Sequence, residues 1–435
     1  MLIPTPRLLR LAATLGVAGI AASFFADARP VWVVAALALA AVAAFDALLA
    51  RRIATPEAQR RLPGSLPLGV AQEVVLRLEN RSALRLDCEV QDHTPAGVES
   101  RGLPQRAAIA PHGWAELRYS ARPVRRGPLG FGTLQLRIAS RLGLWRIERR
   151  AGEAAEVRVY PNFAALTGYA LLAIDNRLSQ IGVLQRRRRG EGLDFHQLRE
   201  YRQGDSPRSI DWKASSRMGK LISREYQDER DQQLLLLVDC GRRMHAQDGE
   251  LSHFDHVLNA ALLLAYVGLR QGDAVGLLTM SGERRWLAPR KSMSTVNLIL
   301  NRVYDLAPTL HTTDYYSAAL ELMGRLRKRA LVVVLSNLRD EDDDSLAPAL
   351  RLLQTRHLVL FASLRESILG RALAARADSF ERALTHAAAA DYLLRRELAF
   401  KRMTRHGAVC LDVEPPELPI ALVNRYIDIK RGGRL

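Results

Sequence analysis

Two carboxylates stand six positions apart in residues 190–221, a stretch rich in arginine and lysine. A pair such as Asp205 and Asp211 can supply the general acid and the general base of a hydrolase. Guanidiniums alternate with these acids, and a guanidinium can also hold a carboxylate through two hydrogen bonds. No nucleophile–base set and no HExxH metal motif accompanies the pair. The sequence therefore favours structural ion pairs, with a hydrolase as the alternative.

The same stretch is expected to form a turn-rich module, because Gly-Asp is followed directly by Ser-Pro at residues 204–207. Alternating charges with aromatics among them suit neither a plain strand nor a plain helix. We expect the module to be held against the domain that follows it by Asp205, Arg208, Asp211 and Arg217, with Trp212 filling a hydrophobic pocket.

One ungapped pattern runs through this module: Arg199-Glu200-Tyr201, Gly204-Asp205, Arg208, Ile210-Asp211-Trp212-Lys213-Ala214-Ser215 and Arg217. It resembles the signature of a bacterial family called domain of unknown function fifty-eight, with Ser206 where an acid is common and Ser216 where alanine is common. The resemblance implies a membrane-anchored protein with a von Willebrand factor A-like domain, whose gene often neighbours that of a MoxR-type AAA+ ATPase. It implies no settled activity. The candidates for a structural or partner-binding role are Arg199, Tyr201, Gly204, Asp205, Arg208, Asp211, Trp212, Lys213 and Arg217.

The composition of the 435-residue chain limits the classes of ligand. Its net charge is +17, most of it from arginine, which suits an anionic lipid surface or nucleic acid. The basic residues are spread along the whole chain without a nucleic-acid reading motif, so nucleic acid is the weaker of these partners. Cys88, Cys240 and Cys410 lie far apart without CxxC spacing, which argues against a disulfide framework or a zinc site and fits a reducing compartment.

Residues 1–54 contain two apolar runs, 8–26 and 31–50, separated by a short turn. Twenty helical residues extend roughly 30 Å, enough to cross the hydrocarbon core of a bilayer. Arginines precede the first run and follow the second, so the positive-inside rule places both ends in the cytoplasm. We therefore expect a transmembrane helical hairpin in the inner membrane, with both termini and the main domains cytoplasmic. A cleaved signal peptide and a pair of buried core helices are the alternatives.

Asp46 lies inside the second apolar run, at about the depth of Arg10 in an antiparallel hairpin. Because an isolated charge in a membrane is costly, we expect the two side chains to pair across the hairpin. Alternatively, Asp46 reaches water at the cytoplasmic end of its helix.

Residues 55–162 alternate apolar and polar positions between clusters of proline and glycine, which predicts an antiparallel β-sandwich of Ig-like size. Residues 163–232 are expected to hold a linker helix, over 164–184, and the signature module. Between them, the arginine run 186–189 predicts either a solvated loop or a phosphate-binding segment.

Residues 233–435 alternate apolar strands with amphipathic helices, the pattern of a doubly wound α/β domain. The family resemblance makes this the von Willebrand factor A-like domain. Strands are expected at 234–238, 274–280, 286–287, 330–335, 358–364 and 408–413, and helices at 254–269, 296–306, 315–326, 346–353, 389–403 and 418–429.

Domains of the von Willebrand A type hold a metal with an Asp-x-Ser-x-Ser motif, a later threonine and a further aspartate. This chain has Asp239 but Gly241 and Arg243 in place of the serines, Thr313 as the threonine, and Asn337 where the second aspartate is expected. A hard cation prefers about six oxygen ligands. We therefore expect a degenerate site without metal or cofactor, in which Arg243 pairs with Asp239, and metal binding is the alternative. The residues Asp239, Arg243, Thr313 and Asn337 then form a candidate partner-binding edge.

These observations predict a membrane-anchored cytoplasmic adaptor or scaffold that is not an enzyme and that works with a MoxR-type AAA+ ATPase. The alternatives are a hydrolase using Asp205 and Asp211, and a binder of anionic lipid or nucleic acid.

Overall fold

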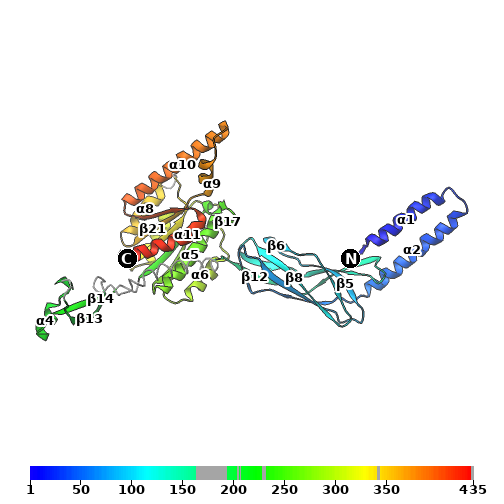
Figure 1. Cartoon of the computed structure of the whole chain (residues 1–435), viewed down its shortest axis with the longest axis horizontal. Helices are drawn as coiled ribbons and strands as arrows, with labels where there is room; N and C mark the ends of the chain where they lie inside the picture. The colour runs from blue at the N-terminus through cyan, green and yellow to red at the C-terminus, as the bar shows by residue number, and fades with distance from the viewer. Residues whose placement is uncertain (163–193, 203–204, 206, 228–231, 340–342, 433–435) are drawn as a thin grey trace. The chain divides into compact units, whose positions relative to one another are not determined.

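A computed structural model of the chain describes residues 1–162, 194–202, 205, 207–227, 232–339 and 343–432 (Figure 1). The chain divides into two compact units, Met1–Tyr160 and Pro161–Leu435. The predicted linker helix, 164–184, and the arginine run, 186–189, lie outside the described residues.

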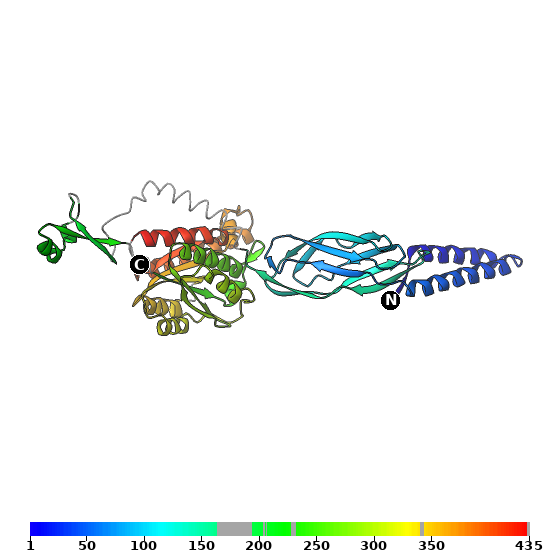
Figure 2. The ribbon, with the colours of Figure 1, turned by 90° about the horizontal axis from the view of Figure 1, so that it is seen from below.

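The first unit begins with an antiparallel pair of helices, α1 (Pro6–Ala22) and α2 (Ala28–Arg51) (Figure 2). Thr5 caps α1 by accepting a hydrogen bond from the Leu8 N–H, and Pro6 fits the first helical position, where no N–H is needed. The indole of Trp32 joins the helices by donating a 2.8 Å hydrogen bond to the Leu15 carbonyl.

One helix of the described residues, α2, is long and apolar enough to cross a membrane, with a mean hydropathy of 2.4. Helix α1 has 17 residues, about 25 Å, and is somewhat short for a span of its own. The structure thus supports an apolar N-terminal anchor, and the second span stays a prediction.

Strands β1–β12 of the first unit form three sheets, antiparallel except for the parallel pair β3–β12. The five-stranded sheet has the order β1 (Leu2–Pro4), β11 (Trp145–Ala151), β10 (Leu134–Ala139), β5 (Leu86–Gln91), β7 (Gln105–Ile109). The four-stranded sheet has the order β2 (Glu57–Arg61), β4 (Gln72–Glu79), β8 (Trp114–Pro123), β6 (Val98–Arg101). The three-stranded sheet has the order β3 (Ser65–Pro67), β12 (Ala155–Tyr160), β9 (Gly127–Phe131).

The predicted alternation of buried and exposed residues is present in these strands. Val74, Leu76 and Leu78 of β4 are buried in the same core as Leu134, Leu136 and Ile138 of β10, although the two strands belong to different sheets. Alternate residues of both sheets therefore share one hydrophobic core, as a strand with one buried face requires.

Asp46 does not pair with Arg10, and it does not reach water, so both expectations for this residue are wrong. Its side chain is 0% exposed and accepts hydrogen bonds from the Ser140 hydroxyl at 2.6 Å and from the backbone N–H groups of Leu142 and Leu144. These donors lie in the loop between β10 and β11. A buried carboxylate needs such donors in place of water. Here they come from a loop of the sheet, outside the two helices from which the pairing was predicted.

The signature module is a two-stranded antiparallel hairpin of β13 (Asp194–Glu200) and β14 (Ile222–Gln227). A 3-10 turn, Pro207–Ser209, and one short helix, α4 (Trp212–Met218), lie between the strands. Asp211 starts α4 by accepting a hydrogen bond from the Ala214 N–H, and Gly219 ends it in the left-handed conformation that glycine adopts without strain.

The last domain has a six-stranded sheet that is parallel except for its edge strand β19. The order is β19 (Trp286–Arg290), β18 (Ala274–Met280), β15 (Gln233–Asp239), β20 (Ala330–Ser336), β21 (Leu358–Leu364), β22 (Val409–Val413). The chain builds outward from β15 to β19 and then returns to β20 on the other side. The strand order therefore reverses between β15 and β20.

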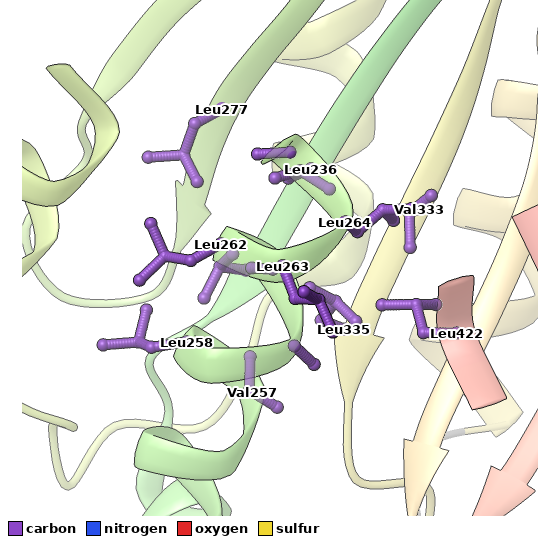
Figure 3. Close-up of a cluster of buried hydrophobic side chains, with 14 of the residues drawn as sticks. Leu236, Val257, Leu258, Leu262, Leu263, Leu264, Leu277, Val333, Leu335 and Leu422 are labelled. Atoms are coloured by element: carbon purple, nitrogen blue, oxygen red, sulfur yellow. The ribbon is translucent and has the colours of Figure 1, made fainter. Parts of the chain in front are cut away.

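Helices cover both faces of this sheet. One core lies beneath α5 (His253–Arg270), α6 (Thr295–Val303) and α11 (Leu418–Arg431). Figure 3 shows part of it, with Leu258 and Leu262 on α5 and Leu422 on α11. The other core lies beneath α7 (Tyr315–Arg325), α8 (Asp343–Gln354) and the second half of α10 (Phe380–Arg405). Strand β15 contributes even-numbered leucines to the first core and odd-numbered leucines to the second, which explains its continuous apolar sequence.

The predicted strands and most of the predicted helices of this domain are confirmed within a few residues. Helix α9 (Ser367–Ala374) was not predicted, and α10 begins at Phe380 instead of the predicted residue 389. The reason is physical: Phe380 and most of the residues up to 388 are exposed, so they carry no apolar stripe with a helical period.

Candidate functional site

The crevice at the carboxyl ends of β15 and β20 is the place where an open α/β sheet binds ligands, because the strand order reverses there. Asp239 is the last residue of β15, and Ser336 is the last residue of β20. Asn337 follows directly, and Thr313 comes from the loop before α7. The topology therefore brings the predicted edge residues to one point.

Asp239 is 0% exposed, and its carboxylate accepts three hydrogen bonds from the protein. Oδ1 accepts from the Thr313 hydroxyl at 2.7 Å and from the Gly241 N–H at 2.8 Å. Oδ2 accepts from the Ser336 hydroxyl at 2.5 Å. Burial raises the pKa of Asp239 above its ordinary value, and these three donors oppose that rise.

Gly241 is required by this arrangement, because a Cβ at that position would collide with the Thr313 hydroxyl. The glycine that replaces the first serine of the metal motif thus makes room for the Thr313–Asp239 hydrogen bond. A serine at position 241 would therefore disrupt the hydrogen bond between Thr313 and Asp239.

Arg243 and Asn337 complete the predicted edge. The Arg243 guanidinium donates a long, 3.5 Å hydrogen bond to the Asn337 carbonyl, and its positive charge lowers the pKa of Asp239. The four residues predicted from sequence are therefore neighbours in the fold, whatever they bind.

The donor set does not fit a divalent cation. The hydroxyls of Thr313 and Ser336 are turned onto Asp239, where they act as donors to a carboxylate. In the described part of the chain, no group of three or more His, Cys, Asp or Glu side chains is arranged to hold a metal ion.

Arg396 lies beside Asn337 in the crevice, and it was not predicted from the sequence. It comes from α10, is 3% exposed, and reaches the ends of three strands. Its guanidinium donates to the Leu338 carbonyl after β20, to the Ser363 hydroxyl and Leu364 carbonyl of β21, and to Asp412 of β22 at 2.8 Å. One arginine thus contacts the carboxyl ends of three of the six strands, β20, β21 and β22.

Asn337 links Arg396 to a second buried polar group. Its side-chain oxygen, Oδ1, accepts from Arg396 at 3.2 Å, and its side-chain amide donates to Glu366 Oε1 at 2.8 Å. The ring of His253 lies 3.5 Å from the same amide, and burial lowers the pKa of His253, which favours the neutral imidazole. These residues stand far apart in the sequence, so no motif could have revealed them.

The rim of the crevice carries an exposed apolar residue, Leu310, whose side chain is 83% exposed. Its loop is fastened to the end of β15, since the Thr309 N–H donates to the Cys240 carbonyl and the Arg242 N–H donates to the His311 carbonyl. The side chain of Arg242, in the loop after β15, is exposed as well. An apolar group next to a cation on a fixed loop is a surface suited to a protein partner.

In the signature module, Arg199 holds Asp205 through two hydrogen bonds of 2.8 and 2.7 Å. The Tyr201 hydroxyl donates to the Asp205 carbonyl, and the Arg202 N–H donates to the Asp205 carboxylate. Hydrogen bonding to Arg199 lowers the pKa of Asp205.

Asp211 is engaged separately. It accepts a 2.8 Å hydrogen bond from Arg224 of β14 as well as the capping bond from Ala214, and these donors lower its pKa. Each carboxylate therefore has its own arginine. Arg224 was not among the predicted residues, because it lies 13 positions beyond Asp211 and outside the family pattern.

Trp212 does not fill a pocket, so that expectation is wrong: its side chain is 69% exposed. A two-stranded hairpin with one short helix has no second layer to cover an indole on the outer side of α4. Lys213 and Arg217 are exposed beside it. Gly204 and the side chain of Arg208 lie outside the described residues. The described partners of Asp205 and Asp211 belong to the module itself, and the clamp onto the next domain stays a prediction.

Comparison with known proteins confirms the family resemblance. Residues 197–373 match the family described as "Protein of unknown function DUF58". The chain is 24% identical over 212 residues to "Uncharacterized protein YeaD" of Bacillus subtilis (strain 168), covering 45% of this chain and 48% of the relative. The chain thus spans about half the length of the curated relative it matches.

Two solved structures are also similar to parts of the chain. An aerotolerance-related membrane protein from Bacteroides fragilis is 13% identical, with a TM-score of 0.25, over 30% of this chain and 67% of that one. Salmonella alpha-2-macroglobulin is 18% identical, with a TM-score of 0.20, over 24% of this chain and 7% of that one. At these TM-scores neither likeness bears on fold or function.

Proposed function

We propose that this chain, whose residues 197–373 match the DUF58 family, is a membrane-anchored, non-enzymatic adaptor that presents the carboxyl edge of its α/β sheet to a partner protein. The observation that carries the proposal is that the buried charged groups of the crevice are hydrogen-bonded by the protein itself. Asp239 and Arg396, two buried charged groups in this crevice, are both engaged by the protein's own donors and acceptors. A catalytic or metal site needs groups that remain available to a ligand.

The finer domain assignments belong to this proposal. The N-terminal sheets are an Ig-like sandwich, and the C-terminal sheet with its filled crevice is a von Willebrand factor A-like domain with a degenerate metal site. Helices α1 and α2 are both spans, and the arginines at 7, 10, 51 and 52 keep both termini and the folded domains in the cytoplasm.

The alternative of a hydrolase is less well supported. Asp205 and Asp211 are each held by an arginine, and each has a lowered pKa. A general acid needs a raised pKa so that it carries a proton near neutral pH. We therefore assign both carboxylates to the internal structure of the signature module.

The partner surface proposed here is the rim of the crevice, with Leu310 and Arg242 as its exposed members. The partner proposed is a MoxR-type AAA+ ATPase, which rests on the family resemblance. An exposed leucine on a fixed loop can act as an anchor at little entropic cost, and a few such residues dominate most interfaces.

The test uses the full chain in lipid nanodiscs and the MoxR-type ATPase of the same organism. Binding is measured by biolayer interferometry without nucleotide, with ADP and with a slowly hydrolysed ATP analogue. Leu310→Ser combined with Arg242→Glu is expected to weaken nucleotide-dependent binding by about tenfold or more, the size of a hot-spot loss. The control is Leu320→Ser, since Leu320 is also exposed but lies on α7.

Three outcomes decide the proposal. Loss with the rim variant and not with the control supports the adaptor function and its surface. Loss with Trp212→Ser alone moves the surface to the signature module, where that indole is exposed. Absence of binding in every nucleotide state contradicts the ATPase as partner.

A further inference from the structure

A cavity of about 660 Å³ lies in the first unit, beside the start of α1. Its walls come from the first residues of α1, from strands β5, β7, β10 and β11, and from the loop between β10 and β11. Six of its lining residues are arginines: Arg7, Arg10, Arg106, Arg137, Arg141 and Arg146. Two lining carboxylates, Asp87 and Glu89, oppose them, which leaves an excess of four positive charges.

The internal ion pairs do not neutralise this excess. Glu89 is shared by three of the arginines, at 4.0 Å from Arg106, 3.8 Å from Arg137 and 3.5 Å from Arg146. A single carboxylate balances one guanidinium. Three cations around it therefore keep a strong preference for a further anion.

The start of α1 adds to the same field. A helix carries partial positive charge at its N-terminus, where backbone N–H groups point along the axis. Thr5 and Pro6, at that end, line the cavity, together with Arg7 of the first turn. The Arg7 guanidinium lies against Gly143, because a Cβ there would stand 3.1 Å from its Nη1. It is thus directed across the cavity toward the loop after β10.

That loop is also the loop that fixes the membrane anchor. Ser140 and Leu142 line the cavity, and both donate hydrogen bonds to Asp46 of α2. Beyond this junction α2 exposes large apolar side chains such as Val31, Val34 and Leu37. If these side chains lie in hydrocarbon, the cavity lies at the depth of the lipid headgroups.

We propose that this cavity binds the phosphate headgroup of an anionic phospholipid. Several guanidiniums converge on a polar cavity at the foot of an apolar helix, and planar guanidiniums bind phosphate oxygens in pairs. Basic pockets beside membrane helices recognise anionic headgroups in this way. The bound lipid links α1 to the sheet that holds α2, and so fixes the depth of the anchor. The inference rests on the membrane anchor of the proposed function and is independent of any protein partner.

The test measures lipids retained by the full chain after extraction from bilayers with equal amounts of phosphatidylcholine and phosphatidylglycerol, by native mass spectrometry. The wild type is expected to retain phosphatidylglycerol over phosphatidylcholine by about tenfold. Each arginine near the membrane surface contributes a several-fold preference for anionic lipid. Arg7→Gln with Arg141→Gln is expected to bring the ratio close to one. Both side chains are exposed, so the substitutions leave the core intact.

The matched control is Arg81→Gln with Arg118→Gln. These arginines are exposed and paired with Glu57 and Glu73, and they lie outside the cavity. The control is expected to keep the wild-type ratio. If the Arg7/Arg141 variant unfolds, the single change Arg106→Gln, in the most exposed of the Glu89 partners, replaces it.

Two results would overturn the proposal. One is an unchanged lipid ratio in a folded cavity variant. The other is binding of inorganic phosphate or glycerol phosphate at low millimolar concentration without any enrichment of phosphatidylglycerol. That result would assign the cavity to a soluble phosphate. In either case the protein is recovered from the bilayer before extraction, so the membrane anchor itself is judged separately.

Discussion

Asp46 accepts a 2.6 Å hydrogen bond from Ser140, a residue 94 positions later in the chain. This contact joins a membrane-type helix to the loop of a β-sheet, and Trp145 strengthens the junction by donating to the Ala43 carbonyl at 2.8 Å. The anchor and the sheet domain of the first unit are therefore one structural piece.

The first prediction concerns this junction. Asp46→Ala removes the acceptor of three donors and is expected to cost about 2–4 kcal/mol of folding free energy, because buried donors to a charged group are left unpaired. Thermal unfolding in detergent and hydrogen exchange of residues 140–145 measure the loss. Asp27→Ala, an exposed acid at the other end of the hairpin, is the control and should change neither. Unchanged exchange at 140–145 in Asp46→Ala would show that the junction is not tight.

The second prediction concerns Arg396. Arg396→Met keeps the length of the side chain but leaves Asp412 and two carbonyls without their donor, at an expected cost of about 3–5 kcal/mol. Hydrogen exchange should rise in the last residues of β20, β21 and β22 together. Arg395→Met removes an exposed i,i+4 pair with Asp391 and is expected to cost less than about 1 kcal/mol. Similar effects of the two variants would remove the structural role assigned to Arg396.

The third prediction is a pH dependence caused by Asp239. Its folded pKa is raised above the ordinary 3.8, so the folded state binds the proton more tightly than the unfolded state. The stabilisation from that proton is fully present below pH 3.8 and is lost as the pH rises through the folded pKa. Asp239→Asn has no such loss. The melting temperature of the variant minus that of the wild type should therefore increase from pH 4.5 to pH 8, and a constant difference would contradict the raised pKa.

The fourth prediction concerns magnesium. Because Thr313, Ser336 and Gly241 already donate to Asp239, calorimetric titration of the full chain with Mg²⁺ is expected to give no heat that depends on Asp239. Comparison with Asp239→Asn isolates this site from weak binding elsewhere. Saturable heat in the wild type that disappears in the variant would show that the hydroxyls can turn away and the site can take a cation.

The fifth prediction concerns the signature module. Arg199→Lys replaces two parallel hydrogen bonds to Asp205 by a point charge, so hydrogen exchange in residues 198–205 is expected to become a few-fold faster. Lys220→Gln breaks only an exposed 3.6 Å pair with Glu200 and should have no effect. Equal exchange in Arg199→Lys and the wild type would mean that the fork geometry is unimportant.

The sequence was most informative where local pattern and burial agree. Strand β15 is apolar at every position because both faces of the sheet are covered, so its place as a buried strand could be read directly. Asp239 and Thr313 were found because the family pattern fixes their positions at strand ends and loops. The topology then brings them within one hydrogen bond of each other.

The sequence was least informative about polar partners far apart in the chain. Arg396 resembles the other arginines of α10, and only the packing of the second half of that helix turns it toward the sheet. A cation was predicted beside Asp46 from the sequence of the two helices alone, whereas its donors come from a loop almost a hundred positions away. Trp212 was predicted to be buried because tryptophan usually is. It is exposed because the two strands and one short helix of its module form no layer that covers it.

The pairing of β1 with β11 has a consequence for biosynthesis. Leu2 pairs with Ile147, so the strand in front of α1 has no partner until the ribosome has made the chain as far as β11. Helices α1 and α2 leave the ribosome long before that, so under the proposed membrane anchoring they enter the bilayer while β1 is still unpaired. Strand β11 would then pair with a segment whose position the membrane has already fixed, and insertion of the anchor would be a precondition for completing the five-stranded sheet.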